Sequence, residues 1–348
     1  MRRIVLMLAI GATAVPVNGQ VASKKAEAPR EYKAPRTPDG HPDLQGYWTT
    51  QTFTPLQRPK RYADKAVLTE EEFTELKKLV EQGNVDPLAG NVLGAEDEQR
   101  AGSVEQRDPT HYDNALWLTT ATPKSLSTRR TSLIIDPPDG RIPPMTADGQ
   151  ARTAARRAAA GFDSYENRPM QERCIVWTHE GPPMVPPPYN DIYRIMQTPG
   201  YFTVLREVNT NLPRFIPTDG RPHLTSAVRQ FGGDSRGRWE GDTLVVETTN
   251  FNDRNPFQGS SAEMKVTERF TRVSADEIRY QFTVDDPKTW TRPWTAEIPM
   301  MKTTGPLYEY ACHEGNYGAP NILRGARAAD QRKAAAAAGK PTTTRQEP

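Results

Sequence analysis

Two short segments of this chain each place a cysteine close to a His-Glu pair, and they contain its only two cysteines. The residues concerned are Cys174 with His179 and Glu180, and Cys312 with His313 and Glu314. A disulfide holds its two Cα atoms about 5.5 Å apart, so a bridge between Cys174 and Cys312 would bring the two pairs into one neighbourhood. Histidine, with an unperturbed pKa of about 6.5, exchanges protons near neutral pH, and a carboxylate can orient it. We therefore predict this disulfide and an acid/base site around it.

The same residue types also bind divalent metals, because two histidines and a glutamate are enough protein ligands for zinc. Their spacing matches no established metal motif, so we predict no cofactor and keep a divalent metal as the less favoured alternative. The structural alternative is a pair of polar surface loops joined by a bridge that serves only stability. No phosphate-binding loop, G-x-S-x-G elbow or H-E-x-x-H helix occurs in the sequence, which removes the enzyme classes that carry them.

A second group of candidate residues lies in the segments IPTDGRPH and GGDSRGRWEGD. His223 supplies another imidazole, Asp234 a carboxylate, and Arg236 a guanidinium that can stabilise a developing negative charge. Many residues around them are turn formers, such as Asp219 and Gly220, and have backbone roles alone. A loop histidine beside proline is also more often structural than catalytic.

Acidic and aromatic residues lie together in a third segment, VDDPKTWTRPW. Asp286 is its candidate proton carrier and Arg292 a candidate anion contact. Trp290 and Trp294 are flat rings that suit sugars or planar ligands, and they serve equally well as core residues. The proline-rich segment GPPMVPPPYND is stiff because of its polyproline II tendency, and it would hold Tyr189 over one end of the fold.

The N-terminal stretch MRRIVLMLAIGATAVPVNGQ is typical of a secretory signal peptide, with two arginines, a short apolar run and small residues before Gln20. The run is shorter than the roughly 20 apolar residues that a membrane-spanning helix needs. We therefore predict cleavage after Gly19 and a secreted or periplasmic location. The 45 basic and 43 acidic residues give a net charge of +2, which offers no attraction for nucleic acid or an anionic membrane. A small molecule is the expected partner, and the oligomeric state stays open.

Two helices are predicted in the first half of the chain. In TEEEFTELKKLVEQ, Thr69 is the N-cap, Glu72 completes a capping box and Gly83 ends the helix. A second helix is expected over residues 147–160. Its three arginines are expected to form a solvated face, and they are Arg152, Arg156 and Arg157.

From about residue 190 the apolar period changes from 3.6 to 2, which predicts strands. Three hairpins are expected in IYRIMQTPGYFTVLREV, GRWEGDTLVVETT and MKVTERFTRVSADEIRYQFTVDD, followed by strands in TRPWTAEIPM and LYEYAC. An earlier strand is expected in PDLQGYWTT. Consecutive strands with short turns favour a mainly β fold, an antiparallel up-and-down barrel, with a two-sheet sandwich as the alternative.

One strand residue does not fit an apolar interior. Alternation in KVTERFTRV places Glu268 between Val266 and Phe270 on the inward face. A buried carboxylate costs several kcal/mol unless it is paired or hydrated, so we predict an interior that is not a solid core. Arg292 is the nearest candidate partner by type, and Tyr280 would line the same interior. The alternative is that Glu268 lies at a rim and is solvated.

The expected organisation follows from these segments and from the usual domain size of about 100–200 residues. It comprises a signal peptide over 1–19, a disordered lead-in over 20–40, a loop-rich region with two helices over 41–190, the barrel over 191–318, and a C-terminal helix with a disordered tail over 319–348.

Six motifs together resemble a family of secreted proteins that is widespread in soil and marine bacteria. They are PDLQGYW, SLIIDPPDGRIPP, RFIPTDGRPH, GDSRGRWEGDTLVVETTNFN, VTERFTRVSADEIRYQFTVDDP and YEYACHEGNYG. The resemblance covers about residues 40–330 and implies secretion and one shared architecture. The family has no established activity, so the resemblance implies no substrate and no catalytic residue. The strand pattern of the later half is also lipocalin-like, which is an analogy of fold alone.

Two functions are compatible with these residues. The first is a small-molecule enzyme, a hydrolase, lyase or isomerase, whose acid/base groups at the barrel mouth are His179, Glu180, His223, Asp286, His313 and Glu314. The alternative is a non-catalytic binder of a hydrophobic or carbohydrate ligand, with contacts from Tyr189, Arg236, Glu268, Tyr280, Trp290, Arg292 and Trp294. An enzyme requires several of the polar groups to converge on one cavity, whereas a binder of this kind requires an apolar cavity.

Overall fold

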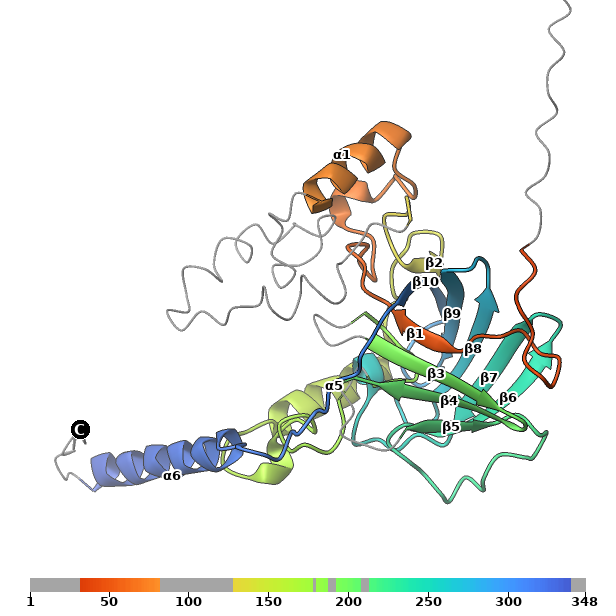
Figure 1. Cartoon of the computed structure of the whole chain (residues 1–348). Coiled ribbons are helices and arrows are strands. Elements are labelled where there is room, and N and C mark those ends of the chain that lie inside the picture. The colour runs from red at the N-terminus through yellow and green to blue at the C-terminus, as the bar shows by residue number, and fades with distance from the viewer. Residues whose placement is uncertain (1–31, 82–127, 178–179, 187–191, 208–212, 339–348) are drawn as a thin grey trace, which may run out of the picture. The chain divides into compact units, whose positions relative to one another are not determined.

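The computed structural model contains a ten-stranded antiparallel sheet (Figure 1). It describes residues 32–81, 128–177, 180–186, 192–207 and 213–338. The strands are β1 (Gly46–Thr49), β2 (Ile134–Asp136), β3 (Ile192–Thr198), β4 (Tyr201–Arg206), β5 (Arg214–Pro217), β6 (Asp234–Glu240), β7 (Thr243–Thr249), β8 (Lys265–Arg272), β9 (Glu277–Asp285) and β10 (Trp294–Thr303). Their order along the sheet is β5-β4-β3-β1-β10-β9-β8-β7-β6, and β2 also pairs with β10. The mainly β, antiparallel fold is therefore confirmed.

The three predicted hairpins are present as β3–β4, β6–β7 and β8–β9. Two of their turns contain Gly200 and Gly241 at φ values of +81° and +60°, a conformation that glycine adopts without a Cβ clash. On β9 the side chains of Ile278, Tyr280 and Phe282 are fully buried, and the residues between them are not. The period-2 pattern thus identified a strand with one buried face.

Two details of the predicted sheet are wrong. LYEYAC, residues 307–312, forms no strand, because β10 already has β1 and β9 as its neighbours in the sheet and Pro306 has no N–H to extend a ladder. The sheet is also not confined to 191–318, since β1 and β2 come from the preceding region. β1 lies between β3 and β10 and thereby joins the two runs of hairpins into one sheet.

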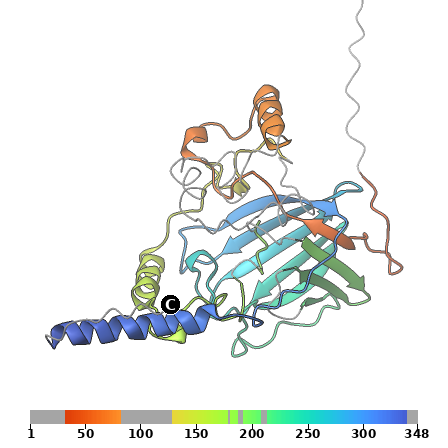
Figure 2. The same ribbon diagram turned by 60° about the vertical axis from the view of Figure 1, so that its left-hand side comes forward.

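The two edge strands, β5 and β6, approach each other without a hydrogen-bonded ladder between their described residues (Figure 1, Figure 2). A Cβ on Gly237 of β6 would lie 2.8 Å from Thr218 Cγ2 and 3.3 Å from Ile216 Cγ2, so glycine permits this approach. Arg214 of β5 also donates to Ser235 Oγ of β6 at 3.0 Å. The result is an open, barrel-like sheet whose edges meet at what we call the β5–β6 seam.

The inward face of the sheet is a packed aromatic core, which corrects the expectation of an interior without one. Its fully buried rings include Trp48, Phe202, Phe270, Tyr280, Phe282 and Trp294. The ring centroids of Phe270 and Tyr280 are 4.9 Å apart, and Phe282 meets Trp294 edge to face at 5.6 Å. Such pairs contribute about 0.5–1.5 kcal/mol each beyond their buried area.

Helix α1 (Glu70–Glu81) begins at the predicted capping box. The N–H of Glu72 donates to Thr69 Oγ1 at 3.2 Å, and the N–H of Thr69 donates to the Glu72 carboxylate at 2.9 Å. Phe73, from the apolar stripe of the helix, packs against a small buried cluster that includes Leu68. The structure therefore confirms the local signals at the start of this helix, whereas Gly83, its predicted end, lies outside the described residues.

Helix α5 (Ala147–Ala159) is also confirmed, but two of its arginines do not form the solvated face that was predicted. Arg152 donates to Thr289 Oγ1 at 2.6 Å. Arg156 donates to two loop carbonyls at 3.2 Å each, and burial lowers its pKa. Arg157 alone is exposed. The arginines fasten the helix to neighbouring loops because guanidinium groups present several donors at once.

The remaining elements are helices that connect or follow the strands in the chain. Helix α6 covers 20 residues, more than the short alanine helix that was expected. The bounds are α6 Gly318–Ala337, η1 Lys60–Tyr62, η2 Tyr165–Asn167 and η3 Phe257–Gly259, where η marks a 3-10 helix. No helix in the described part of the chain is long and apolar enough to cross a membrane. The predicted signal peptide lies outside the described residues.

Candidate functional site

A pocket of about 580 Å³ opens at the β5–β6 seam. Strands β4, β5 and β6 contribute to its lining, together with nearby loops. Its apolar part includes Val176, Met184 and Val204, and its polar part includes Glu180, Arg206, Arg214, Arg229, Asp234 and Ser235. Small-molecule sites usually have volumes of roughly 300–1,000 Å³, so this pocket is large enough for an organic ligand.

A buried ion pair lies directly beneath this pocket. Glu268 of β8 is fully buried, and Arg214, which lines the pocket, donates to both of its carboxylate oxygens. Glu268 therefore points inward, as predicted. Its partner is not Arg292, which instead pairs with Asp136 at 2.9 Å on the exposed surface. Burial of an unpaired carboxylate is prohibitive, so the pair explains how an acid is accommodated in this core.

Hydroxyl groups of two adjacent strands complete the contacts of the Arg214 guanidinium. Nη2 donates to Ser235 Oγ and to Thr248 Oγ1 at 3.0 Å each. Ser235 of β6 and Thr248 of β7 are cross-strand partners, and their side-chain oxygens are 2.9 Å apart. The guanidinium is thus held by three residues from three strands, which fixes its orientation at the edge of the pocket.

Tyr280 links this ion pair to the backbone of Met184, which also lines the pocket. Its hydroxyl donates to Glu268 Oε1 at 2.8 Å and accepts from the backbone N–H of Met184 at 2.9 Å. Burial, and then the negative charge of Glu268, raise the pKa of Tyr280 well above its ordinary value of about 10. The phenol therefore remains protonated and acts as a fixed donor to the carboxylate.

Arg206, at the end of β4, is buried in the pocket lining, and no ion pair joins it to an acid in the described part of the chain. Only 6% of its surface is exposed, and it continues the inward face formed by Phe202 and Val204. Its Nε and Nη1 atoms are buried and make no hydrogen bond in the described part of the chain. The guanidinium carbon lies 5.5 Å from the ring centroid of Tyr193, its cross-strand neighbour, which is a cation–π contact.

His223, Asp234 and Arg236 lie together beside the pocket. His223 Nδ1 is 2.8 Å from Asp234 Oδ2, and Arg236 Nη1 donates to Asp234 Oδ1 at 2.6 Å. His223 Nε2 lies 3.6 Å from Glu247 Oε1. Asp234 lines the pocket, whereas His223 and Arg236 are not among the lining residues. Both nitrogens of the imidazole therefore face carboxylates, which suits a positioning role better than proton exchange with a ligand.

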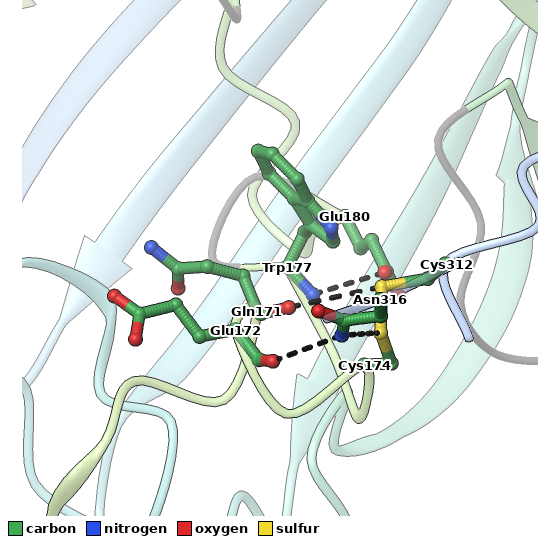
Figure 3. Close-up of a disulfide and its surroundings, with 7 residues drawn as sticks. All are labelled: Gln171, Glu172, Cys174, Trp177, Glu180, Cys312 and Asn316. Atoms are coloured by element: carbon green, nitrogen blue, oxygen red, sulfur yellow. Dashed lines mark hydrogen bonds between the residues drawn. A yellow bond between two sulfur atoms is a disulfide. The ribbon is translucent and has the colours of Figure 1, made fainter. Parts of the chain in front are cut away.

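The predicted disulfide between Cys174 and Cys312 is present, with 5.6 Å between the Cα atoms (Figure 3). Asn316 supports it, because Nδ2 donates to the backbone oxygen of Glu172 at 3.5 Å and lies 3.3 Å from Cys174 Sγ. A second hollow of about 360 Å³ lies beside the bridge, and its lining includes Trp177 and Cys312. The bridge thus joins the chain's middle to the segment that precedes α6.

The bridge does not bring the described members of the two His-Glu pairs into one pocket. Glu180 lines the pocket at the seam, and its Oε1 accepts a hydrogen bond from the backbone N–H of Trp177 at 2.9 Å (Figure 3). His313 and Glu314 are exposed in a turn and are not lining residues. The disulfide holds Cys312 close to Cys174 but does not determine the direction of the next two side chains, which point into solvent.

Two of the predicted site residues, His179 and Tyr189, lie outside the described residues. Within the described ranges there is no group of three His, Cys, Asp or Glu side chains that could hold a metal ion. The described candidate site at the seam therefore consists of arginines, acids and an apolar wall.

The third predicted cluster belongs to the core and the surface. Asp286 is 2% exposed and accepts from Thr289 Oγ1 at 2.7 Å, so it holds a loop in place. Trp290 and Trp294 pack edge to face, with 6.0 Å between ring centroids. Together with Arg292, these residues are absent from the lining of the pocket. Of the two roles considered for the tryptophans, packing in the core is the one that the structure displays.

Sequence reasoning missed the two arginines at the seam, although a signal for them exists. In FTVLR, Arg206 follows Val204 at a spacing of two, and in RFIP, Arg214 shares parity with Ile216. A charged residue at an inward-facing strand position needs either a partner or a ligand. The same test had singled out Glu268, and applying it to every strand would have found both arginines.

No family model, curated protein or solved structure matches this chain. Fold similarity would in any case not assign a function. The resemblance of the six motifs to a secreted bacterial family stays a prediction, and the function has to be argued from the residues at the seam.

Proposed function

We propose that this protein binds a small organic molecule in the pocket at the β5–β6 seam. The observation that carries the proposal is the combination of a pocket of about 580 Å³ with a lining that is half apolar wall and half oriented polar groups. Ligand sites typically combine these two features. The lining differs from the purely hydrophobic cavity expected for a binder, because Arg206, Arg214 and Asp234 contribute to it.

The rigidity of the polar groups supports a binding site. Arg214 is held by Glu268, Ser235 and Thr248 from three different strands. Groups that are already oriented lose little conformational freedom when a ligand arrives, so more of the interaction energy appears as affinity. Strands position such groups more accurately than loops do.

An extracytoplasmic location is part of the proposal. It is supported by the signal-peptide pattern before Gln20 and by the disulfide between Cys174 and Cys312, since such bridges persist in oxidising compartments. N-terminal sequencing of the exported protein should begin at Gln20, and an intact N-terminus on cytoplasmic protein would contradict this part.

An acid/base enzyme is the second candidate, and it depends on Glu180. Of the acids and bases proposed as catalytic, Glu180 is the described one that lines the pocket. A carboxylate at a ligand site can transfer protons. Under this alternative, Glu180→Gln abolishes turnover of a bound compound while leaving its Kd within about threefold, whereas under the binding proposal no turnover is detected in either protein.

The binding proposal is tested by closing the pocket. Gly232 lines it, and a Cβ there would meet only the Gly181 carbonyl oxygen at 3.7 Å, an ordinary contact. Gly232→Trp should therefore fill the pocket without a backbone clash. Gly325→Trp is the matched control, because a Cβ at Gly325 in α6 meets nothing within 4 Å.

The assay is ligand-observed NMR with a fragment set that contains anionic, neutral and cationic compounds. Fragments should bind the wild type and Gly325→Trp, and Gly232→Trp should lose them while keeping the wild-type circular dichroism spectrum. Equal binding to Gly232→Trp, or no binding of any fragment to the wild type, contradicts the proposal.

A further inference from the structure

Three ionisable groups of the pocket lining have a partner of opposite charge among the described residues, whereas Arg206 has none there. Arg214 pairs with Glu268, and Arg229 pairs with Glu263 at 3.1 Å. Asp234 has Arg236 and His223 as partners. No described acid lies within ion-pair distance of Arg206, whose buried nitrogens Nε and Nη1 make no hydrogen bond.

An uncompensated guanidinium at this depth is unfavourable in an empty pocket. Arginine cannot shed its proton in a protein, and an unpaired buried charge costs several kcal/mol. The contact with the Tyr193 ring at 5.5 Å offsets only about 0.5–2 kcal/mol. A bound anion would provide the missing partner, and the pocket is the space from which it would reach Arg206.

The rest of the lining narrows the class of anion. Val176, Met184 and Val204 are almost fully buried and form the apolar wall of the pocket that Arg206 also lines, so a matching ligand has an apolar body. Two carboxylates, Glu180 and Asp234, also line the pocket and disfavour a second negative charge. One uncompensated cation therefore matches a monoanion better than a phosphate dianion.

We infer that the pocket binds a small organic monocarboxylate, with its carboxylate at Arg206 and its hydrocarbon body against the wall of Val176, Met184 and Val204. This inference rests on the proposed binding function and specifies its ligand class. Planar carboxylates match the planar donors of a guanidinium, and such charge-assisted hydrogen bonds are stronger than neutral ones. The ligand carboxylate supplies the negative charge that no described residue places at Arg206.

The test variant and its control replace two arginines that each lie over a tyrosine ring. Arg206→Met removes the guanidinium and keeps a stem of similar length. Arg194→Met is the control, since Arg194 also lies over a tyrosine ring, Tyr47 at 5.4 Å, but is exposed and absent from the pocket lining. Arg206→Lys keeps the charge and loses the planar fork, and it serves as a second variant with conserved charge.

The probes are benzoate with benzamide and hexanoate with hexanamide, measured by ligand-observed NMR titration at constant ionic strength. Each acid should bind the wild type, and its amide should bind roughly ten- to a hundredfold more weakly, as loss of a charged hydrogen bond predicts. Arg206→Met should weaken the acids by a similar factor and leave the amides unchanged, with Arg206→Lys in between. Arg194→Met should match the wild type.

Removal of Arg206 also has a predicted effect on the melting temperature of the ligand-free protein. Because the side chain has no counterion among the described residues, the melting temperature of ligand-free Arg206→Met should equal or exceed that of the wild type. A structural arginine would lower it, and this result would overturn the inference.

The possible results distinguish a failure of the monocarboxylate inference from a failure of the proposed binding function. Equal binding of acids and amides, or acids that bind Arg206→Met as well as the wild type, overturns the ligand class and leaves the pocket's function standing. If neutral or cationic fragments bind the wild type, lose binding in Gly232→Trp, and the acids do not bind, the ligand class is likewise overturned and the binding function stands. Absence of binding by every charge class overturns both.

Discussion

Replacement of Arg214 by methionine is the most direct test of the buried ion pair beneath the pocket. Arg214 donates to both oxygens of Glu268, which has no exposed surface. Methionine fills the volume of the stem and supplies no donor. The substitution therefore leaves a carboxylate in the core with Tyr280 as its remaining described side-chain donor.

The expected magnitude follows from this geometry. Removing one partner of a buried pair destabilises a protein by about 3–5 kcal/mol, because the other charge stays in a medium that solvates it poorly. Whole domains have unfolding free energies of about 5–15 kcal/mol. Arg214→Met should thus lose a large part of the stability. Arg194→Met, at an exposed position on β3, should change it by no more than about 0.5 kcal/mol.

A double variant separates the charge from the packing. Arg214→Met combined with Glu268→Gln removes both charges, and the glutamine oxygen still accepts from Tyr280. Its stability loss should be smaller than that of Arg214→Met alone.

The assay is urea unfolding followed by tryptophan fluorescence, with the disulfide intact. Trp48 and Trp294 are fully buried, so their emission should shift when the core opens. An unchanged m value indicates that stability alone has changed. A loss below about 1 kcal/mol for Arg214→Met, or a double variant less stable than the single one, would refute the reasoning that Glu268 depends on Arg214.

Two further predictions concern the disulfide and the side chain of Tyr280. Cys174→Ser with Cys312→Ser removes a cross-link between positions 138 residues apart and should lower the unfolding free energy by about 2–5 kcal/mol; titratable thiols in the native wild type would contradict the bridge itself. Above pH 10 wild-type stability should fall, because unfolded tyrosine ionises while Tyr280, whose pKa is raised by burial, stays protonated when folded. Tyr280→Phe should be less stable at pH 7 but show a slope shallower by up to about 1.4 kcal/mol per pH unit, and equal slopes would count against the raised pKa.

Local patterns in the sequence were enough to predict individual elements. The capping box of Thr69 and Glu72 defines the start of α1 because both partners lie within one turn. Alternation over Ile278 to Val284 identifies β9 and its buried face. The disulfide was predictable because the chain offers only two cysteines. In each case the interacting groups are close in sequence or have no competitors.

The identity of long-range partners was decided by the tertiary structure. Arg214 is 54 residues from Glu268 in the chain, and the sequence pattern had favoured Arg292 as the partner. β1 enters between β3 and β10, although nothing in its four residues specifies those neighbours. The lack of a described counterion at Arg206 likewise appears only once Arg214, Arg229 and Asp234 have been placed against their partners. The alternation of residues along each strand determined which side chains face inward. The assembled sheet determined which of them form pairs, because the attraction between two charges depends on their separation in space and not on their separation along the chain.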